Sequence, residues 1–204
     1  MLKRVLFVVF LMACLGILFF SGCKTADPAS YTLTVTLGNG VSGTPATGSY
    51  TYTEDDTVNY SYTAQAGYGN LTVTLDGAPV AASGTIAMAA SHNLNVTADI
   101  DVRGQWTGRL NYGAGGAYYT VTFSGGVLSG TTSGMFDFVP GTGTGDFTVS
   151  GSQINFTLRY HIYGTDYVLE CTGTLSDINT MSGDYTWRDD STIYDQFTWN
   201  LARD

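Results

Sequence analysis

The sequence has few charged residues, few cations among them, and few residues of the kinds that build metal sites. Charged residues make up 12% of the 204 positions, and the chain has eight Lys and Arg, two His and three Cys. So few cations cannot form the basic stripe that phosphate binding needs, which excludes nucleic acid as a partner. His92 has no second His or Cys at ligand spacing, so the sequence predicts no metal site, and we expect no cofactor.

The chain also lacks long helical patterns. From Tyr31 onward no ten residues repeat with a period of 3.6, whereas apolar and polar residues alternate with a period of two. Gly (26 residues) and Tyr (14 residues) are numerous, as is usual in strands and their turns. The sequence therefore predicts an all-β protein, with a small antiparallel β-repeat domain followed by a meander that forms a barrel or a sandwich.

One long apolar run is present, and it stands at the N-terminus. Lys3 and Arg4 precede sixteen apolar residues, Val5 to Phe20, and Ser21-Gly22 follows them. A helix that crosses a bilayer needs about 20 apolar residues, so this run is short for an anchor. A positive start, an apolar core and a small-residue exit are typical of a secretory signal. We expect residues 1–22 to be a cleaved signal peptide, with an uncleaved anchor helix as the alternative.

The end of this run, Phe20-Ser21-Gly22-Cys23, resembles the lipobox of bacterial lipoproteins, with Phe20 at a position where Leu is usual. The resemblance implies that Cys23 receives a diacylglyceryl thioether, becomes the mature N-terminus and is then N-acylated. Stable anchoring takes at least two acyl chains, in agreement with that chemistry. Lys24 stands where Asp retains family members in the inner membrane. The resemblance therefore implies a lipid-anchored protein of the bacterial cell envelope, in the outer membrane where the organism has two membranes.

Removal of the signal makes the chain more acidic. Lys3 and Arg4 leave with it, so six Lys and Arg remain against 17 Asp and Glu, a formal charge of −11. Such a charge repels anionic lipid, so the acyl chains on Cys23 must supply the affinity for the bilayer.

Processing also removes cysteines. Cys14 leaves with the signal and Cys23 is acylated, which leaves Cys171 as the only thiol of the mature chain. Cys171 shares one strand face with Tyr167 and Leu169, so we expect it to be buried and inert. Without acylation of Cys23, a bridge between Cys23 and Cys171 becomes the alternative, which an exported setting permits.

Residues 23–30 are a polar tether, and residues 31–101 form the first predicted domain. Alternation and turn residues indicate about six short strands over a thin one-sided core. Asp76-Gly77 has the sequence of a type I′ turn. The block resembles the divergent InlB-B-like repeats of bacterial surface proteins, through Tyr31-Thr32-Leu33-Thr34-Val35, Gly67-Tyr68 and Val96-Thr97-Ala98. That resemblance implies a spacer or interaction module without catalytic residues.

Residues 102–204 form the second predicted domain, with the boundary near Asp101. About eight or nine strands follow one another at hairpin spacing. Trp106 lies in the first strand and Trp199 in the last, and we expect these strands to pair and close a barrel. Gly104-Gln105-Trp106 and the meander resemble small barrels of the avidin and lipocalin type. Either a filled core or a pocket fits the expected interior, which includes Phe123, Phe136, Phe156, Tyr160 and Trp199.

The remaining polar motifs indicate solvated surface. Arg159 and His161 share the polar face of one strand with Asn155, Thr157 and Tyr163, and a binding patch is the alternative there. The acidic turns at residues 54–56 and 189–191 lack the spacing of known Ca²⁺ loops. The glycine-rich stretches 113–116 and 141–145 lead into strands, so they lack the helix N-terminus that cradles phosphate.

Together these features favour a membrane-anchored bacterial lipoprotein that acts without catalysis as a surface or periplasmic binding or structural module. Its expected partners are the bilayer, through acylated Cys23, and a protein, glycan or small apolar ligand. A lipocalin-like carrier of a small apolar ligand is one alternative. A hydrolase is the other, and it requires an open cleft in which His161 meets two carboxylates.

Overall fold

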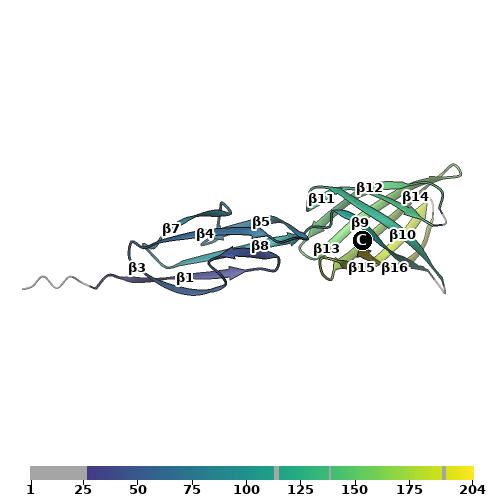
Figure 1. The fold of residues 1–204 in the computed structure, drawn as a ribbon. Helices are drawn as coiled ribbons and strands as arrows, with labels where there is room; N and C mark the ends of the chain where they lie inside the picture. Colours follow the sequence, from purple (N-terminus) through teal and green to yellow (C-terminus); the bar gives the residue numbers. More distant parts are fainter. Residues whose placement is uncertain (1–26, 113–114, 138, 190–191) are drawn as a thin grey trace, which may run out of the picture. The chain divides into compact units, whose positions relative to one another are not determined.

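The protein is all-β, as predicted, and contains a closed barrel. The computed structural model describes residues 27–112, 115–137, 139–189 and 192–204, and the described part contains sixteen strands and no helix. Figure 1 shows β1 to β8 in one body and β9 to β16 in a second. The buried apolar residues form two separate clusters, one from residues 33–96 and one from residues 102–201.

The first body is a two-layer sandwich. One sheet has five strands in the order β3-β1-β8-β5-β6, and the other has three in the order β2-β4-β7. Leu33 and Leu94 from the larger sheet and Tyr60 and Ile86 from the smaller one belong to the same buried cluster. The strands are β1 (Ser30–Leu37), β2 (Val41–Thr44), β3 (Gly48–Thr53), β4 (Thr57–Ala64), β5 (Tyr68–Leu75), β6 (Ala78–Val80), β7 (Ser83–Ala87) and β8 (His92–Ile100).

The sandwich differs from the sequence prediction in three respects. It has eight strands where six were expected, because the very short β2 and β6 leave little alternation to detect. Its core lies between two sheets and is not one-sided, since strands of both sheets turn apolar residues to it. Finally, β1 and β8 pair in parallel, with Val35 opposite Leu94, whereas the pairs β2–β4, β4–β7, β5–β6 and β5–β8 are antiparallel.

The turn at Asp76-Gly77 has the predicted geometry. Asp76 has φ 51° and Gly77 has φ 82°, as a type I′ turn requires of both central residues. The Asp76 carboxylate also accepts a hydrogen bond from the backbone N–H of Asn93 and contacts His92 Nδ1 at 2.6 Å. These contacts hold the pKa of Asp76 below its ordinary value, the bond to His92 being the larger cause. The turn after β5 is thereby joined to the start of β8.

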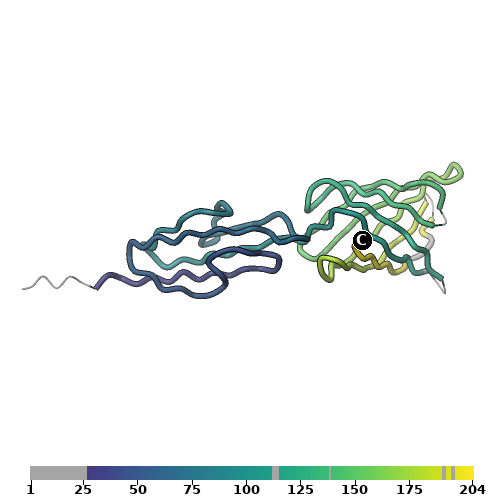
Figure 2. The backbone as a smooth tube through the Cα atoms, in the orientation of Figure 1, coloured from purple at the N-terminus to yellow at the C-terminus, as the bar shows by residue number. Residues whose placement is uncertain are grey.

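The second body is an eight-stranded antiparallel barrel. Its strands pair in chain order, and β16 pairs with β9 to close it, with Trp199 opposite Leu110 and Arg203 opposite Trp106. In Figure 2 the yellow end of the chain lies beside the teal strand that begins the barrel. The strands are β9 (Gly104–Tyr112), β10 (Gly115–Gly125), β11 (Ser129–Phe136), β12 (Gly143–Ser150), β13 (Gln153–Ile162), β14 (Thr165–Leu175), β15 (Thr180–Asp189) and β16 (Ile193–Arg203).

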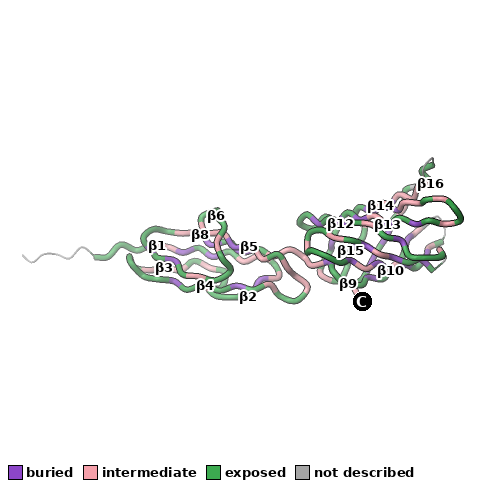
Figure 3. Tube along the Cα trace, turned by 90° about the horizontal axis from the view of Figure 1, so that it is seen from above, coloured by how far each residue is buried: buried purple, intermediate pink, exposed green. Residues whose placement is uncertain are grey.

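Closure confirms the predicted pairing of the first and last strands, and it has a clear physical cause. An open eight-stranded meander would leave a row of unpaired backbone groups along β9 and another along β16. In the closed barrel both rows are paired, and each strand turns alternate residues inward. Figure 3 shows buried residues along the barrel strands.

Large rings fill the barrel interior where glycines face them. A Cβ built at Gly143 would lie 2.3 Å from the Tyr160 ring, and one at Gly173 would lie 2.3 Å from the Trp199 ring. Phe123 packs edge-on against Phe147 and Phe156, with ring centroids 5.2 and 5.4 Å away. All five interior residues named from the sequence are buried: Phe123, Phe136, Phe156, Tyr160 and Trp199.

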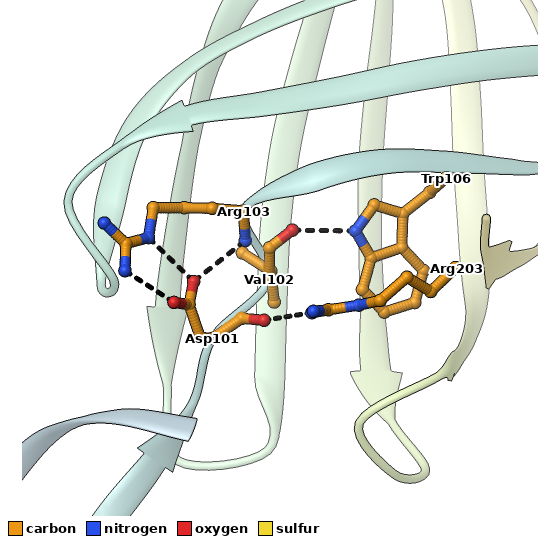
Figure 4. Close-up of polar contacts among 5 residues, drawn as sticks. All are labelled: Asp101, Val102, Arg103, Trp106 and Arg203. Atoms are coloured by element: carbon orange, nitrogen blue, oxygen red, sulfur yellow. Dashed lines mark hydrogen bonds and ion pairs between the residues drawn. The ribbon is translucent and has the colours of Figure 1, made fainter. Parts of the chain in front are cut away.

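A polar cluster fixes the chain where it begins the barrel (Figure 4). The Asp101 carboxylate accepts hydrogen bonds from Arg103 N, Nε and Nη2 at 3.0, 2.8 and 2.5 Å. Trp106 Nε1 donates to the carbonyl of Val102 at 2.7 Å, and Arg203 Nη2 donates to the carbonyl of Asp101. The Arg203 guanidinium also lies 4.8 Å from the centre of the Trp106 ring. The residues before β9 are thus joined to the end of β16.

Candidate functional site

The strand directions give the barrel two different ends. The chain enters at Gly104, and we call the opposite end, where β9, β11, β13 and β15 finish, the distal end. Four connections lie there, after residues 112, 136, 162 and 189. The hairpin between β13 and β14 is a two-residue turn of Tyr163 and Gly164 between the paired residues Ile162 and Thr165.

Four aromatic side chains meet at the distal end, and we call Phe136, Tyr160, Tyr167 and Trp187 the distal aromatic cluster. The Trp187 and Tyr167 rings stack with centroids 5.6 Å apart and planes 29° apart. Tyr160 lies 6.0 Å from Trp187, and Phe136 packs edge-on against Trp187 at 5.9 Å. The cluster arises because β11, β13, β14 and β15 all carry an inward aromatic residue at this level.

The four side chains of the distal aromatic cluster differ in how far they are buried. Phe136 and Tyr160 are 4% and 3% exposed, whereas Tyr167 and Trp187 are only partly buried. The pairing of β15 with β16 shifts register between Trp187 and Arg188. Such irregularities re-aim side chains and occur often beside functional sites. Trp187 and Tyr167 are therefore the members of the cluster that border solvent.

Tyr119 lies directly beneath this cluster. Its ring stacks on Phe136 with centroids 5.5 Å apart, and its side chain is 2% exposed. Tyr119 Oη has no hydrogen-bond partner among the described residues. Burial raises the pKa of Tyr119 well above its ordinary value, so the phenol is neutral and can donate a hydrogen bond to an acceptor.

Other buried polar groups inside the described barrel do have partners, apart from Nε of Arg203 at the entry end. Tyr160 Oη donates to the carbonyl of Gly134 at 3.1 Å, and Trp199 Nε1 donates to that of Asp184 at 2.9 Å. Thr132 Oγ1 donates to the carbonyl of Thr157 at 2.5 Å. A buried polar group without a partner is rare and calls for an explanation. The Tyr119 hydroxyl is thus an exception within this interior.

Ion pairs flank the distal aromatic cluster on the outer wall. Arg188 Nη2 contacts Glu170 Oε1 at 2.7 Å, and this bond is the main reason that the pKa of Glu170 is below its ordinary value. His161 Nδ1 contacts Asp166 Oδ1 at 2.5 Å, and both side chains are more than two-thirds exposed. Neither pair faces the barrel interior, because both follow the outward positions of their strands.

A polar groove crosses the outer wall of the barrel. It has a volume of about 500 Å³ and includes Thr131, Thr144, Asp146 and Arg159 in its lining. A second hollow of about 420 Å³ shares Asp146 and Arg159 and reaches Glu170. The predicted polar face of β13 therefore borders two hollows, and Arg159 lies in both.

The structure places the other sequence candidates as follows. Cys23 and the signal segment lie outside the described residues, as do Asp190 and Ser191 of the second acidic turn. Cys171 is 1% exposed and its pKa is raised by burial, in agreement with a buried, inert thiol. No group of three or more His, Cys, Asp or Glu in the described part of the chain is placed to hold a metal ion.

Two residues of the distal end could not be identified from the sequence. Trp187 takes part in the cluster through Phe136 and Tyr160, whose strands are not its neighbours in the sheet. Only the register of the closed barrel brings these rings together. Tyr119 shares its strand face with the predicted interior residue Phe123, but the lack of a partner for its hydroxyl depends on every surrounding side chain.

In comparisons with known proteins, no family model, curated protein or solved structure matches the chain. Within the residues that the structure describes, no helix has the length and hydropathy needed to span a membrane.

Proposed function

We propose that this protein is a lipid-anchored bacterial envelope protein that acts without catalysis and uses its barrel as a rigid binding module. The observation that carries the binding role is the distal aromatic cluster, where Trp187 and Tyr167 border solvent at one end of a closed barrel. Aromatic residues with an open face are common in ligand and partner sites. The anchor rests on the sequence pattern that ends at Cys23.

The proposed anchor agrees with the position of the first strand. Strand β1 begins at Ser30, so only residues 23–29 separate the proposed acylated cysteine from folded structure. A tether of that length holds a domain close to a bilayer. The outer membrane is the proposed location where the organism has two membranes.

Metabolic labelling tests the anchor. Cells that express the full chain are grown with an alkyne fatty acid, and the wild type is compared with Cys23→Ser and with the control Cys171→Ser. We expect label and membrane fractionation for the wild type and for Cys171→Ser, and loss of both for Cys23→Ser. Unchanged label in Cys23→Ser would refute the proposed anchor.

The second candidate function is a carrier of a small apolar ligand in the barrel. The specific observation in its favour is the unpartnered Tyr119 hydroxyl beneath the distal aromatic cluster. The Trp199 ring that fills the barrel opposite Gly173 limits the room for such a ligand to the distal part. Native mass spectrometry of the purified protein tests this function through the mass of a co-purified small molecule.

The geometry gives little support to a hydrolase. The described contacts of His161 include one carboxylate, that of Asp166, and the pair lies on the exposed outer wall. General acid–base chemistry works best where burial or neighbouring charge adjusts a pKa. We therefore keep the binding module as the proposed function.

A further inference from the structure

We propose that the distal end of the barrel binds a neutral, mostly apolar small molecule through a hydrogen bond from Tyr119 Oη to its single acceptor group. A ketone, aldehyde or ester carbonyl on a short hydrocarbon body has this chemistry. The proposal rests on the ligand-binding role given above and adds the ligand class and the residue that selects it. Three features of the described structure support it.

The first feature is the hydroxyl itself. Burial of a hydroxyl without a hydrogen bond costs free energy, and the Tyr160, Trp199 and Thr132 groups of the barrel interior avoid that cost. Tyr119 has Phe136 against its ring face but no acceptor for its O–H among the described residues. An acceptor brought by a ligand would remove this penalty only in the complex, so the hydroxyl favours bound over free protein.

The second feature is the route to it. Phe136 contacts Tyr119, Tyr160 and Trp187, so it lies between the buried hydroxyl and the residues that border solvent. Trp187 and Tyr167 are the partly buried members of this group, and the β-bulge lies at Trp187. A ligand that enters between these rings would place its apolar body against aromatic faces and its acceptor near Tyr119.

The third feature decides the charge of the ligand. The described interior around Tyr119 consists of aromatic and aliphatic residues with the thiol of Cys171. Arg203, an inward-facing cation, lies at the opposite end of the barrel, beside Trp106. A carboxylate beside Tyr119 would thus be buried without a cation, which is costly, whereas a neutral carbonyl needs only the one bond.

The test compares 2-octanone with octane, which has a similar body and no acceptor. The protein is the full chain with Cys23→Ser, so that no acyl chain competes for the site, and binding is followed by tryptophan fluorescence. Tyr119→Phe removes the orphan hydroxyl. Tyr62→Phe is the matched control, because Tyr62 lies in the sandwich outside the proposed site, is 2% exposed like Tyr119, and already donates its hydroxyl to the carbonyl of Pro45 at 2.8 Å.

We expect the wild type and Tyr62→Phe to bind the ketone about five- to tenfold more tightly than the alkane. We expect Tyr119→Phe to bind both equally, and its melting temperature without ligand to be unchanged or higher, because an unsatisfied group is removed.

Three other results would overturn the proposal in different ways. If the wild type binds both compounds equally, Tyr119 does not select the ligand, although the distal end remains a binding site. If the wild type binds neither, the ligand-binding role itself fails. A lower melting temperature for Tyr119→Phe with no change in ligand preference would show that an internal water satisfies the hydroxyl, and would also overturn the proposal.

Discussion

At the scale of single residues, the glycines inside the barrel set how large the facing rings can be. A Cβ at Gly173 would lie 2.3 Å from the Trp199 ring and 2.5 Å from the carbonyl oxygen of Ser182. Both neighbours would have to move, and the carbonyl belongs to a paired strand. Position 173 therefore requires glycine because no larger side chain fits there, and not because of its backbone freedom.

We therefore expect Gly173→Ala to lower the free energy of unfolding by about 1–3 kcal/mol, the usual cost of overpacking. The control is Gly38→Ala, where the new Cβ would meet its nearest atoms at ordinary contact distances of 3.4–3.5 Å. Chemical denaturation of both variants gives the measurement. Equal stability of the two variants would argue against the packing described around Trp199.

In the turn between β13 and β14 we predict a substitution that raises the free energy of unfolding. Tyr163 has φ 50° and is 96% exposed, so it accepts a left-handed backbone without gaining packing. Bulky residues are strained there by about 1–2 kcal/mol, whereas Asn adopts this conformation readily. We expect Tyr163→Asn to raise the free energy of unfolding by roughly 1 kcal/mol, measured by thermal denaturation.

Gly164→Ala provides the comparison for this turn. Gly164 has φ 86°, which a Cβ disfavours, so this variant should lose stability although it adds nothing but a methyl group. If Tyr163→Asn and Gly164→Ala shifted the melting temperature in the same direction, backbone conformation would not be what governs this hairpin.

At the scale of elements, the segment before β9 depends on one carboxylate. Asp101 accepts three hydrogen bonds from Arg103, and these contacts lower the pKa of Asp101. A lowered pKa means that the stabilisation is present above the ordinary Asp value of about 4 and is lost as the pH falls below it. We expect Asp101→Asn to cost about 1–2 kcal/mol of unfolding free energy at pH 7.

Urea denaturation of both proteins at pH 7 and pH 3 measures this dependence. The difference between wild type and Asp101→Asn should shrink at pH 3, because the Asp101 carboxylate of the unfolded wild type is then protonated, which favours unfolding. A difference that stays the same at both pH values would show that charge on Asp101 is not the source of the stabilisation.

The elements also show what the sequence can and cannot predict. Alternation from Tyr31 to Leu201 predicts strands and their inward residues, and the Trp-bearing first and last strands predict the closed barrel. Alternation carries no information on pairing between strands far apart in the chain, so the parallel β1–β8 pair was missed. The distal aromatic cluster was missed for the same reason, since its rings come from four strands whose register the barrel sets.

At the scale of the whole molecule, the buried barrel interior makes the fold sensitive to high pH. Burial raises the pKa of Cys171, Tyr119 and Tyr160 above their ordinary values. In the unfolded chain the pKa is about 8.5 for Cys and 10 for Tyr. Below these values the buried neutral groups add their full share to the stability of the fold. As the pH rises further, the unfolded chain loses protons first, so this share of the stability is lost.

We expect the melting temperature to be steady from pH 7 to about 8.5 and to fall at higher pH. Cys171→Ala should be less stable than the wild type at pH 7, because a buried atom is lost, but should fall less steeply between about pH 8.5 and 10. Calorimetry across this pH range measures the melting temperatures of both proteins. Identical slopes for the two proteins would mean that the thiol does not contribute.

The two bodies differ in whether they leave strands unpaired on one side. The barrel pairs every strand on both sides, so a neighbouring molecule cannot extend it. In the sandwich, β3, β6, β2 and β7 each have a free side. Strand pairing between neighbouring copies would therefore have to start from these four outer strands of the sandwich, because the barrel offers no edge.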